Sequence, residues 1–171
     1  MKNKLIYAVL IGLITMIGFE LGGAVYEGVV VASQWGAHPP ESFAILQGPY
    51  ALPVEHFWIP LHMFVQVLIV AALVLCWKHK RVRNMIFIIV GLYLLLRIPT
   101  FLYFIPELNA FSTTEPTGAF SKELKERADL WANLSTVRTL IIASVYVLSW
   151  MALSRFNKRQ KHVDSQVNIV R

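Results

Sequence analysis

Long apolar runs constrain the fold of this chain more than any other feature of its sequence. Several of these runs reach or approach the roughly 18 residues expected of a transmembrane helix. Of the 171 residues, 56% are hydrophobic and only 15% are charged, well below the roughly 25% that is typical of soluble domains. We therefore expect a multi-pass integral protein of the cell membrane, with the lipid bilayer as its main partner.

Four apolar segments predict an all-α bundle of four transmembrane helices. The expected spans cover, in chain order, residues of about 5–32, 55–77, 84–104 and 134–153. Pro99 is expected to kink the third span. Residues 1–155 then form a single transmembrane domain, and residues 156–171 form a basic tail on the cytoplasmic side.

Two longer loops are expected between these spans. The first, residues 33–54, is rich in proline and glycine, which argues against a long helix there. The second covers residues 105–133, and its last part predicts an amphipathic helix that continues into the fourth span. This helix places Leu124, Ala128 and Trp131 on one face, and it allows a favourable pair four residues apart. That pair is Glu123 with Arg127.

The distribution of Lys and Arg predicts the orientation in the membrane. The amino-terminal start, the KHKRVR turn at 78–83 and the tail are basic, whereas the first long loop has no Lys or Arg. We therefore expect both termini in the cytoplasm and both long loops outside. The net charge of +6 does not indicate nucleic-acid binding, because the positive residues lie beside the spans. The basic start also fits a signal peptide, but the apolar run continues past any cleavage point and lacks an A-x-A site.

Two carboxylates interrupt the first apolar run. Glu20 and Glu27 are seven residues apart, so they share one face of a helix. Charges within a membrane span are expensive, and they usually face the bundle interior and mark a functional site or a specific partner. Near them, Gly18 and Gly22 form a G-x-x-x-G pair. This pair fits either close packing within one bundle, which we favour, or a homo-oligomer interface.

Counting depth along each predicted span brings the ionisable residues to one layer, in the outer half of the membrane. Each of the four helices contributes at least one of them: Glu20 and Glu27, then His62, then Arg97 with Tyr93 one turn away, then Arg138. Glu55 and Gln66 lie on the same helix face as His62. Three interpretations of this layer remain open.

In the first interpretation, the two acids and the two arginines neutralise each other as internal ion pairs. In the second, they form a pocket for an anionic, phenolic or quinone-like ligand, with Arg97 and Arg138 as hydrogen-bond donors. The third is a metal site, since Glu20, Glu27 and His62 are plausible ligands. However, the chain has no Glu-x-x-His pair of the di-iron type and no His-Glu-x-x-His, so no metal is predicted.

A single cysteine excludes a redox pair of thiols within the chain. Cys76 is the only cysteine, so neither an intramolecular disulfide nor a CxxC pair is possible. Near a helix end, it is expected to act as a small apolar filler.

Three short stretches carry a resemblance to a known family. They are Phe104–Phe111 (FIPELNAF), Trp131–Arg138 (WANLSTVR) and the glycine-rich segment that ends in Tyr26-Glu27. Their order and spacing resemble the anthrone-oxygenase-like family of small four-helix membrane proteins, which is largely a domain of unknown function. On this resemblance the family positions are Pro106, Asn109, Trp131 and Arg138. Fungal members often carry His at or near the position of Ser135.

The resemblance implies oxidation of a lipophilic aromatic or quinone-like compound without a dedicated cofactor. Such a reaction needs a base that forms a phenolate or enolate, and donors that hold the developing oxyanion. The base candidates are Glu20, Glu27 and His62, and the substrate-binding candidates are Tyr93, Arg97, Asn109, Trp131 and Arg138. The alternative is a non-catalytic ligand-binding or accessory subunit with structural charges. A transporter is less favoured, because four spans are few and no duplicated halves are visible.

Overall fold

The computed structural model describes the backbone of residues 2–169 and the side chains of residues 3–158. All regular elements in this part of the chain are helical. They are, in chain order, α1 (Lys2–Tyr26), the π-helical segment η1 (Glu27–Val31), α2 (Ala32–Trp35), the 3-10 helix η2 (Glu41–Leu46), α3 (Glu55–Leu75), α4 (Lys80–Pro99), the π-helical segment η3 (Thr100–Phe104), α5 (Ile105–Thr113) and α6 (Lys122–Ile169). The basic tail is therefore helical up to Ile169, and residues 170 and 171 lie outside the described residues.

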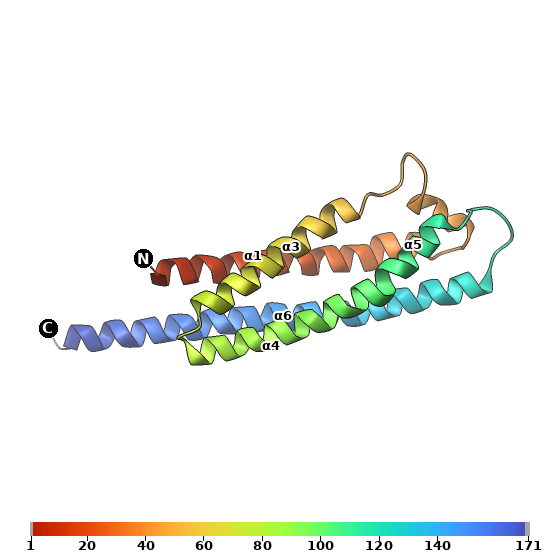
Figure 1. Cartoon of the computed structure of the whole chain (residues 1–171). Helices are drawn as coiled ribbons and strands as arrows, with labels where there is room; N and C mark the ends of the chain where they lie inside the picture. The colour runs from red at the N-terminus through yellow and green to blue at the C-terminus, as the bar shows by residue number, and fades with distance from the viewer. Residues whose placement is uncertain (1, 170–171) are drawn as a thin grey trace.

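Four of the helical stretches in the described chain are long and apolar enough to cross a membrane. They are Asn3–Trp35, Glu55–Leu75, Lys80–Thr113 and Lys122–Lys158. This confirms the prediction of an all-α fold with four candidate spans. The two termini lie at one end of the bundle, together with the short α3–α4 turn (Figure 1). The two longer connections lie at the opposite end (Figure 1).

The prediction of a long second loop at residues 105–133 is wrong. The third span continues through η3 and α5 to Thr113, and only residues 114–121 connect it to α6. Pro106 does not end the helix, and it lies at the second position of α5, directly after the π-helical segment η3. Pro99 is followed directly by the π-helical segment η3, so the helix widens there and then continues. The predicted run of residues 121–131 into the fourth span is confirmed, since α6 is one continuous helix.

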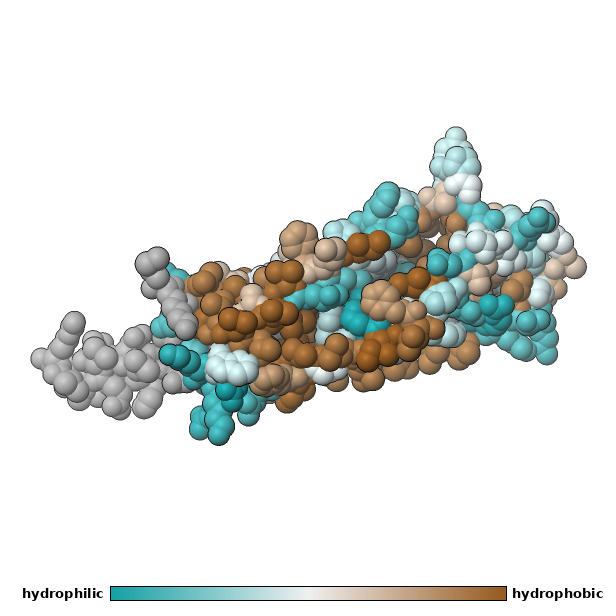
Figure 2. Space-filling model, viewed as in Figure 1, coloured by the Kyte–Doolittle hydropathy of each residue, from teal (hydrophilic) through white to brown (hydrophobic). Residues whose placement is uncertain are grey.

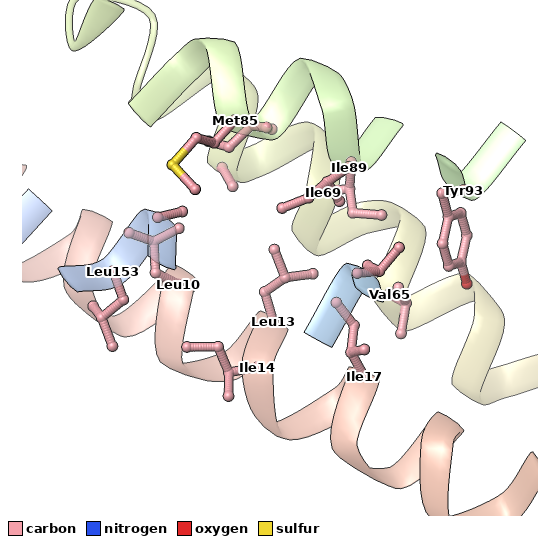
Figure 3. Packing of buried hydrophobic residues seen from close by; sticks show 14 of the residues in the cluster. Leu10, Leu13, Ile14, Ile17, Val65, Ile69, Met85, Ile89, Tyr93 and Leu153 are labelled. Atoms are coloured by element: carbon pink, nitrogen blue, oxygen red, sulfur yellow. The ribbon is translucent and has the colours of Figure 1, made fainter. Parts of the chain in front are cut away.

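The bundle core, as we call the larger hydrophobic cluster, lies between all four long helices. Figure 3 shows Leu13 and Ile17 of α1 facing Val65 of α3 and Ile89 of α4, with Tyr93 at one end. All of these side chains are at most 5% exposed. α1 packs mainly on α3 and α6, and α6 also packs on α4.

The aromatic cap, as we call the second cluster, closes the end of the bundle that carries the long connections. Its buried members are Val31, Ala32, Trp35, Phe43, Phe104, Phe111, Ala128 and Trp131. The ring centroid of Trp35 lies 5.4 Å from that of Phe111 and 5.2 Å from that of Trp131. Phe43, which comes from the first long connection, stacks on Phe111 at 4.9 Å. These contacts explain why α5 is an ordered helix, because Phe111 is fully buried only when α5 lies against α6 and η2.

Polar contacts also stabilise the end of the bundle that carries the aromatic cap. Arg127 of α6 holds Glu107 of α5 through two hydrogen bonds, of 2.7 and 3.0 Å. The predicted partner of Arg127, Glu123, is therefore replaced by a residue from another helix, which a local pattern within α6 does not reveal. Gln47 of the first connection donates to the backbone carbonyls of Phe111 and Thr114.

The side chain of Phe111 should be a main source of stability for the aromatic cap. Phe111→Ala is expected to lower the free energy of unfolding by about 3–5 kcal/mol, because it empties a fully buried aromatic site. Unfolding of the purified protein in mild detergent, followed by circular dichroism, measures the change. The matched control is Phe101→Ala, since Phe101 is 66% exposed. Equal stability of the two variants would contradict the cap.

Candidate functional site

A layer of charged and polar side chains separates the bundle core from the aromatic cap. On α1, Glu20 follows the buried residues of the bundle core, and Glu27, the first residue of η1, precedes the cap. Arg97 on α4 and Arg138 on α6 occupy the corresponding stretches of their helices, and His62 comes from the first half of α3. Figure 2 shows hydrophilic residues that interrupt the hydrophobic surface in the middle of the molecule.

Glu20 is the centre of this layer and is completely buried. Arg97 donates from Nη2 to Oε1 of Glu20 at 3.4 Å. The hydroxyl of Tyr93 donates to the same carboxylate, 3.4 Å from Oε2 and 3.5 Å from Oε1. Nδ1 of His62 lies 3.2 Å from Oε1, although its N–H is not aligned as in a good hydrogen bond. Glu20 thus draws polar groups from α3 and α4 toward α1.

Helical spacing explains why these groups meet. Glu20 lies about one turn after Ile17, so it continues the buried face of α1. Tyr93 and Arg97 are four residues apart on α4, and the Arg97 guanidinium lies 5.0 Å from the centre of the Tyr93 ring. Because Arg97 and Glu20 carry opposite charges, their pairing offsets the large penalty for burying each of them. For this pair, the interpretation as a structural ion pair fits the geometry.

The charged cavity lies beside this cluster, between α1, α3 and α6. Its lining residues are Ala24, Glu27, Gly28, Trp58, His62, Trp131, Ser135, Arg138, Thr139 and Ile142. Its volume is about 30 Å³, which is room for about two water molecules. His62 belongs both to this cavity and to the contacts of Glu20, so it links the two parts of the layer.

Arg138 differs from Arg97, because Glu27 and Glu20 attract its charge only from beyond ion-pair distance. Within the described part of the chain, no carboxylate lies within ion-pair distance of its guanidinium, and its buried Nε has no hydrogen-bond acceptor. Its main contact is the ring of Phe104, with the guanidinium carbon 4.1 Å from the ring centre. The hydroxyl of Ser135, one turn earlier on α6, is also buried without a partner. The charged cavity therefore contains donors with no acceptor from the protein.

The structure brings most of the predicted site residues together, but not all of them. Glu20, His62, Tyr93 and Arg97 form one cluster, and Glu27, His62, Trp131 and Arg138 line the charged cavity. The indole of Trp131 is buried and donates to the Phe104 carbonyl at 3.2 Å.

Asn109, predicted from the family resemblance, does not belong to either group. It lies on the exposed face of α5, where its carbonyl accepts from Ser112 and Thr113. Glu55 and Gln66, expected on the face of His62, are likewise exposed.

Sequence reasoning missed Trp58 as a wall of the cavity. Its ring stacks on that of His62, with centroids 5.3 Å apart and an angle of 22° between the planes. The signal was present, since Trp58 lies one helical turn before His62 on α3.

Among the residues that the structure describes, no three His, Cys, Asp or Glu side chains are grouped so that they could hold a metal ion. Cys76 is buried in the bundle core, as its predicted role as an apolar filler requires.

Comparison with known proteins leaves the site to be interpreted from its own geometry. No protein-family model, no curated protein and no solved structure matches this chain. The class that the fold and the site define is an all-helical protein with four helices able to span a membrane and a charged layer buried between them. The resemblance to the anthrone-oxygenase-like family is neither supported nor contradicted by these comparisons.

The pairing of Glu20 with Arg97 generates a prediction for stability. Glu20→Gln is expected to lower the free energy of unfolding by about 3–5 kcal/mol, because it leaves the buried guanidinium of Arg97 without its counter-charge. Adding Arg97→Met in the same chain should recover part of this loss. Reversible unfolding in detergent of the two single variants and the double variant measures the coupling.

The control for this cycle is Glu126→Gln. Glu126 pairs with Lys122 on the exposed side of α6, at 3.7 Å, so its loss should change stability by about 1 kcal/mol or less. Strictly additive effects of Glu20→Gln and Arg97→Met would contradict the ion pair.

Proposed function

We propose that this protein binds a lipophilic aromatic compound of the phenol or quinone type, and that an oxygen of this ligand enters the charged cavity. The observation that carries the proposal is Arg138. Its guanidinium is partly buried, makes no ion pair or hydrogen bond with the residues that the structure describes, and is attracted by Glu27 only from a longer distance. A ligand oxygen that accepts from it offsets the cost of this burial. The aromatic walls, Trp58 and Trp131, favour a flat aromatic ligand over a small inorganic anion.

The side chains of the charged layer have different roles in such a site. Arg138 donates hydrogen bonds to the ligand oxygen and stabilises negative charge on it. Glu27 and His62 line the same cavity and are the two groups in reach to accept a proton from a bound phenol or enol. Oε1 of Glu20 lies 3.2 Å from Nδ1 of His62, while Tyr93 and Arg97 hold Glu20 in place.

The activity that fits these roles is that of an oxygenase without a dedicated cofactor, as the family resemblance implies. In that reaction an anthrone and dioxygen give an anthraquinone and water. The protein removes a proton from the substrate, and the resulting electron-rich enolate reacts with dioxygen. Arg138 lowers the energy of this enolate by holding its oxygen.

A second candidate function is a non-catalytic membrane subunit that binds the same kind of ligand. One observation favours it: Glu20 and Arg97 already form an internal ion pair, so part of the layer is structural. The two candidates differ in whether the bound ligand is converted.

The location of the protein is part of the same proposal. We place it in the cell membrane, with both termini and the α3–α4 turn in the cytoplasm, because the Lys and Arg residues gather at that end. The charged layer then lies in the outer half of the bilayer.

Ligand binding should depend on Arg138. Tryptophan fluorescence quenching by menadione, a two-ring quinone, reports binding to the protein in lipid nanodiscs. Arg138→Leu is expected to weaken binding roughly ten- to a hundredfold, which corresponds to the loss of about 1.5–3 kcal/mol from a charge-assisted hydrogen bond. Arg155→Leu serves as the control, since Arg155 is exposed on the same helix.

Unchanged menadione affinity in Arg138→Leu would contradict the proposed site. Oxidation of anthrone, followed by absorbance, then separates the two candidate functions. An enzyme should lose about a hundredfold or more in kcat with His62→Ala or Glu27→Gln while it still binds menadione. Binding without turnover in the wild-type protein favours the accessory subunit.

The orientation can be tested with a membrane-impermeant maleimide on intact cells. Ala119→Cys, in the connection before α6, should be labelled directly, and Lys78→Cys should be labelled only after permeabilisation, because the two exposed positions lie at opposite ends of the bundle. The native Cys76 is buried and serves as the unlabelled background. The reverse labelling pattern would place the termini outside.

A further inference from the structure

A second and larger hollow adjoins the charged cavity. This lateral groove, as we call it, has a volume of about 500 Å³ and opens on the side of the bundle between α1 and the start of α3. The residues that matter here are Gly18, Gly22 and Gly23 on α1, and Phe57 and Trp58 on α3, with Glu27 where the groove meets the cavity. Both Glu27 and Trp58 line the cavity as well as the groove.

The size of the charged cavity makes the lateral groove necessary for an aromatic ligand. At about 30 Å³ the cavity accepts a carbonyl or hydroxyl oxygen. It does not accept a ring, since a protein cavity known to bind benzene measures about 150 Å³. A volume of about 500 Å³, in contrast, lies within the usual range for small-molecule sites. The ring of a ligand whose oxygen reaches Arg138 must therefore lie in the groove.

The walls of the groove have the shape and chemistry that a flat ring requires. A Cβ at Gly23 would lie 2.6 Å from the Phe57 ring, so this glycine lets α3 approach α1 and form the floor. A Cβ at Gly22 would meet nothing within 4 Å, so the space above this residue is open. Phe57 and Trp58 meet edge to face at 4.9 Å and present an aromatic wall.

We propose that the lateral groove receives a fused-ring aromatic quinone, phenol or ketone from the hydrocarbon region of the membrane and holds its rings while one oxygen enters the charged cavity. This inference rests on the proposed function and adds the route of entry and the substrate class. The groove faces the side of the bundle, so a ligand dissolved in the bilayer reaches it without crossing the aromatic cap.

A second copy of this chain is the competing occupant, through the Gly18 and Gly22 face. The position of Glu27 argues against it. An apolar helix seated in the groove would enclose the Glu27 carboxylate further without giving it a new donor, and removing a carboxylate from water is costly. A ligand with a hydroxyl or carbonyl group instead places a polar atom beside Glu27, where the groove meets the cavity.

The backbone also changes at the junction of groove and cavity. α1 ends at Tyr26, and a π-helical segment begins at Glu27. Such segments carry an extra residue in one turn and occur often at functional sites, where they re-aim a side chain. In this chain the change falls on the carboxylate that the groove and the cavity share.

The test fills the groove without touching the charged cavity. Gly22→Leu adds a side chain to the open space. It should weaken menadione binding in nanodiscs at least tenfold, and its thermal stability should equal that of the control variant. The control is Gly91→Leu on α4, another exposed membrane glycine with nothing within 4 Å of an added Cβ. It should change the affinity by less than twofold. Gly22→Ala should give an intermediate loss.

The outcomes separate this inference from the function on which it rests. If Arg138→Leu weakens binding and Gly22→Leu does not, the groove is not the ring site, and only this inference fails. If wild-type protein binds none of menadione, anthrone and anthraquinone, the proposed function fails together with it. Light scattering in detergent gives the mass of the particle and so the oligomeric state. If the wild-type protein is a dimer, and Gly22→Leu is a monomer with unchanged menadione affinity, the groove binds a second copy of the chain instead.

Discussion

The burial of one carboxylate, Glu20, governs the arrangement of the four helices. A charge enclosed between apolar helices is tolerated only with an opposite charge and hydrogen-bond donors around it. Arg97 supplies the opposite charge, and Tyr93 and His62 complete the surroundings from α4 and α3. The same contacts position the helices relative to α1, because a rotation of α3 or α4 would leave the carboxylate exposed to hydrocarbon.

The pairing of Glu20 with Arg97 also determines which side chains of the charged layer remain available to a ligand. Arg97 is paired with Glu20, whereas Arg138 faces a small cavity that Glu27 also lines, and it makes no ion pair with the residues that the structure describes. The charged layer thus has two parts, which are the structural Glu20 cluster and the charged cavity around Arg138. His62 belongs to both parts, because it lines the cavity and its Nδ1 lies 3.2 Å from Oε1 of Glu20.

Most of the fold was predictable because it follows from local hydrophobicity. Four apolar runs gave four spans, and the pattern at Leu124, Ala128 and Trp131 gave the buried face of α6. The helix at residues 105–113 was not predicted, because the local pattern there does not reveal it. Its order depends on Phe111, which is buried by rings from segments distant in sequence.

The sequence by itself determined the composition and approximate depth of the charged layer, since both depend only on helical rise and on the lengths of the apolar runs. It did not determine which acid pairs with which arginine, that Asn109 faces outward, or that a groove between α1 and α3 adjoins the cavity. These features were decided by the tertiary structure. The physical reason is that packing sets the rotation of each helix and how closely two helices approach. Here, the contact of Gly23 with Phe57 and the need of the buried Glu20 for polar partners set both.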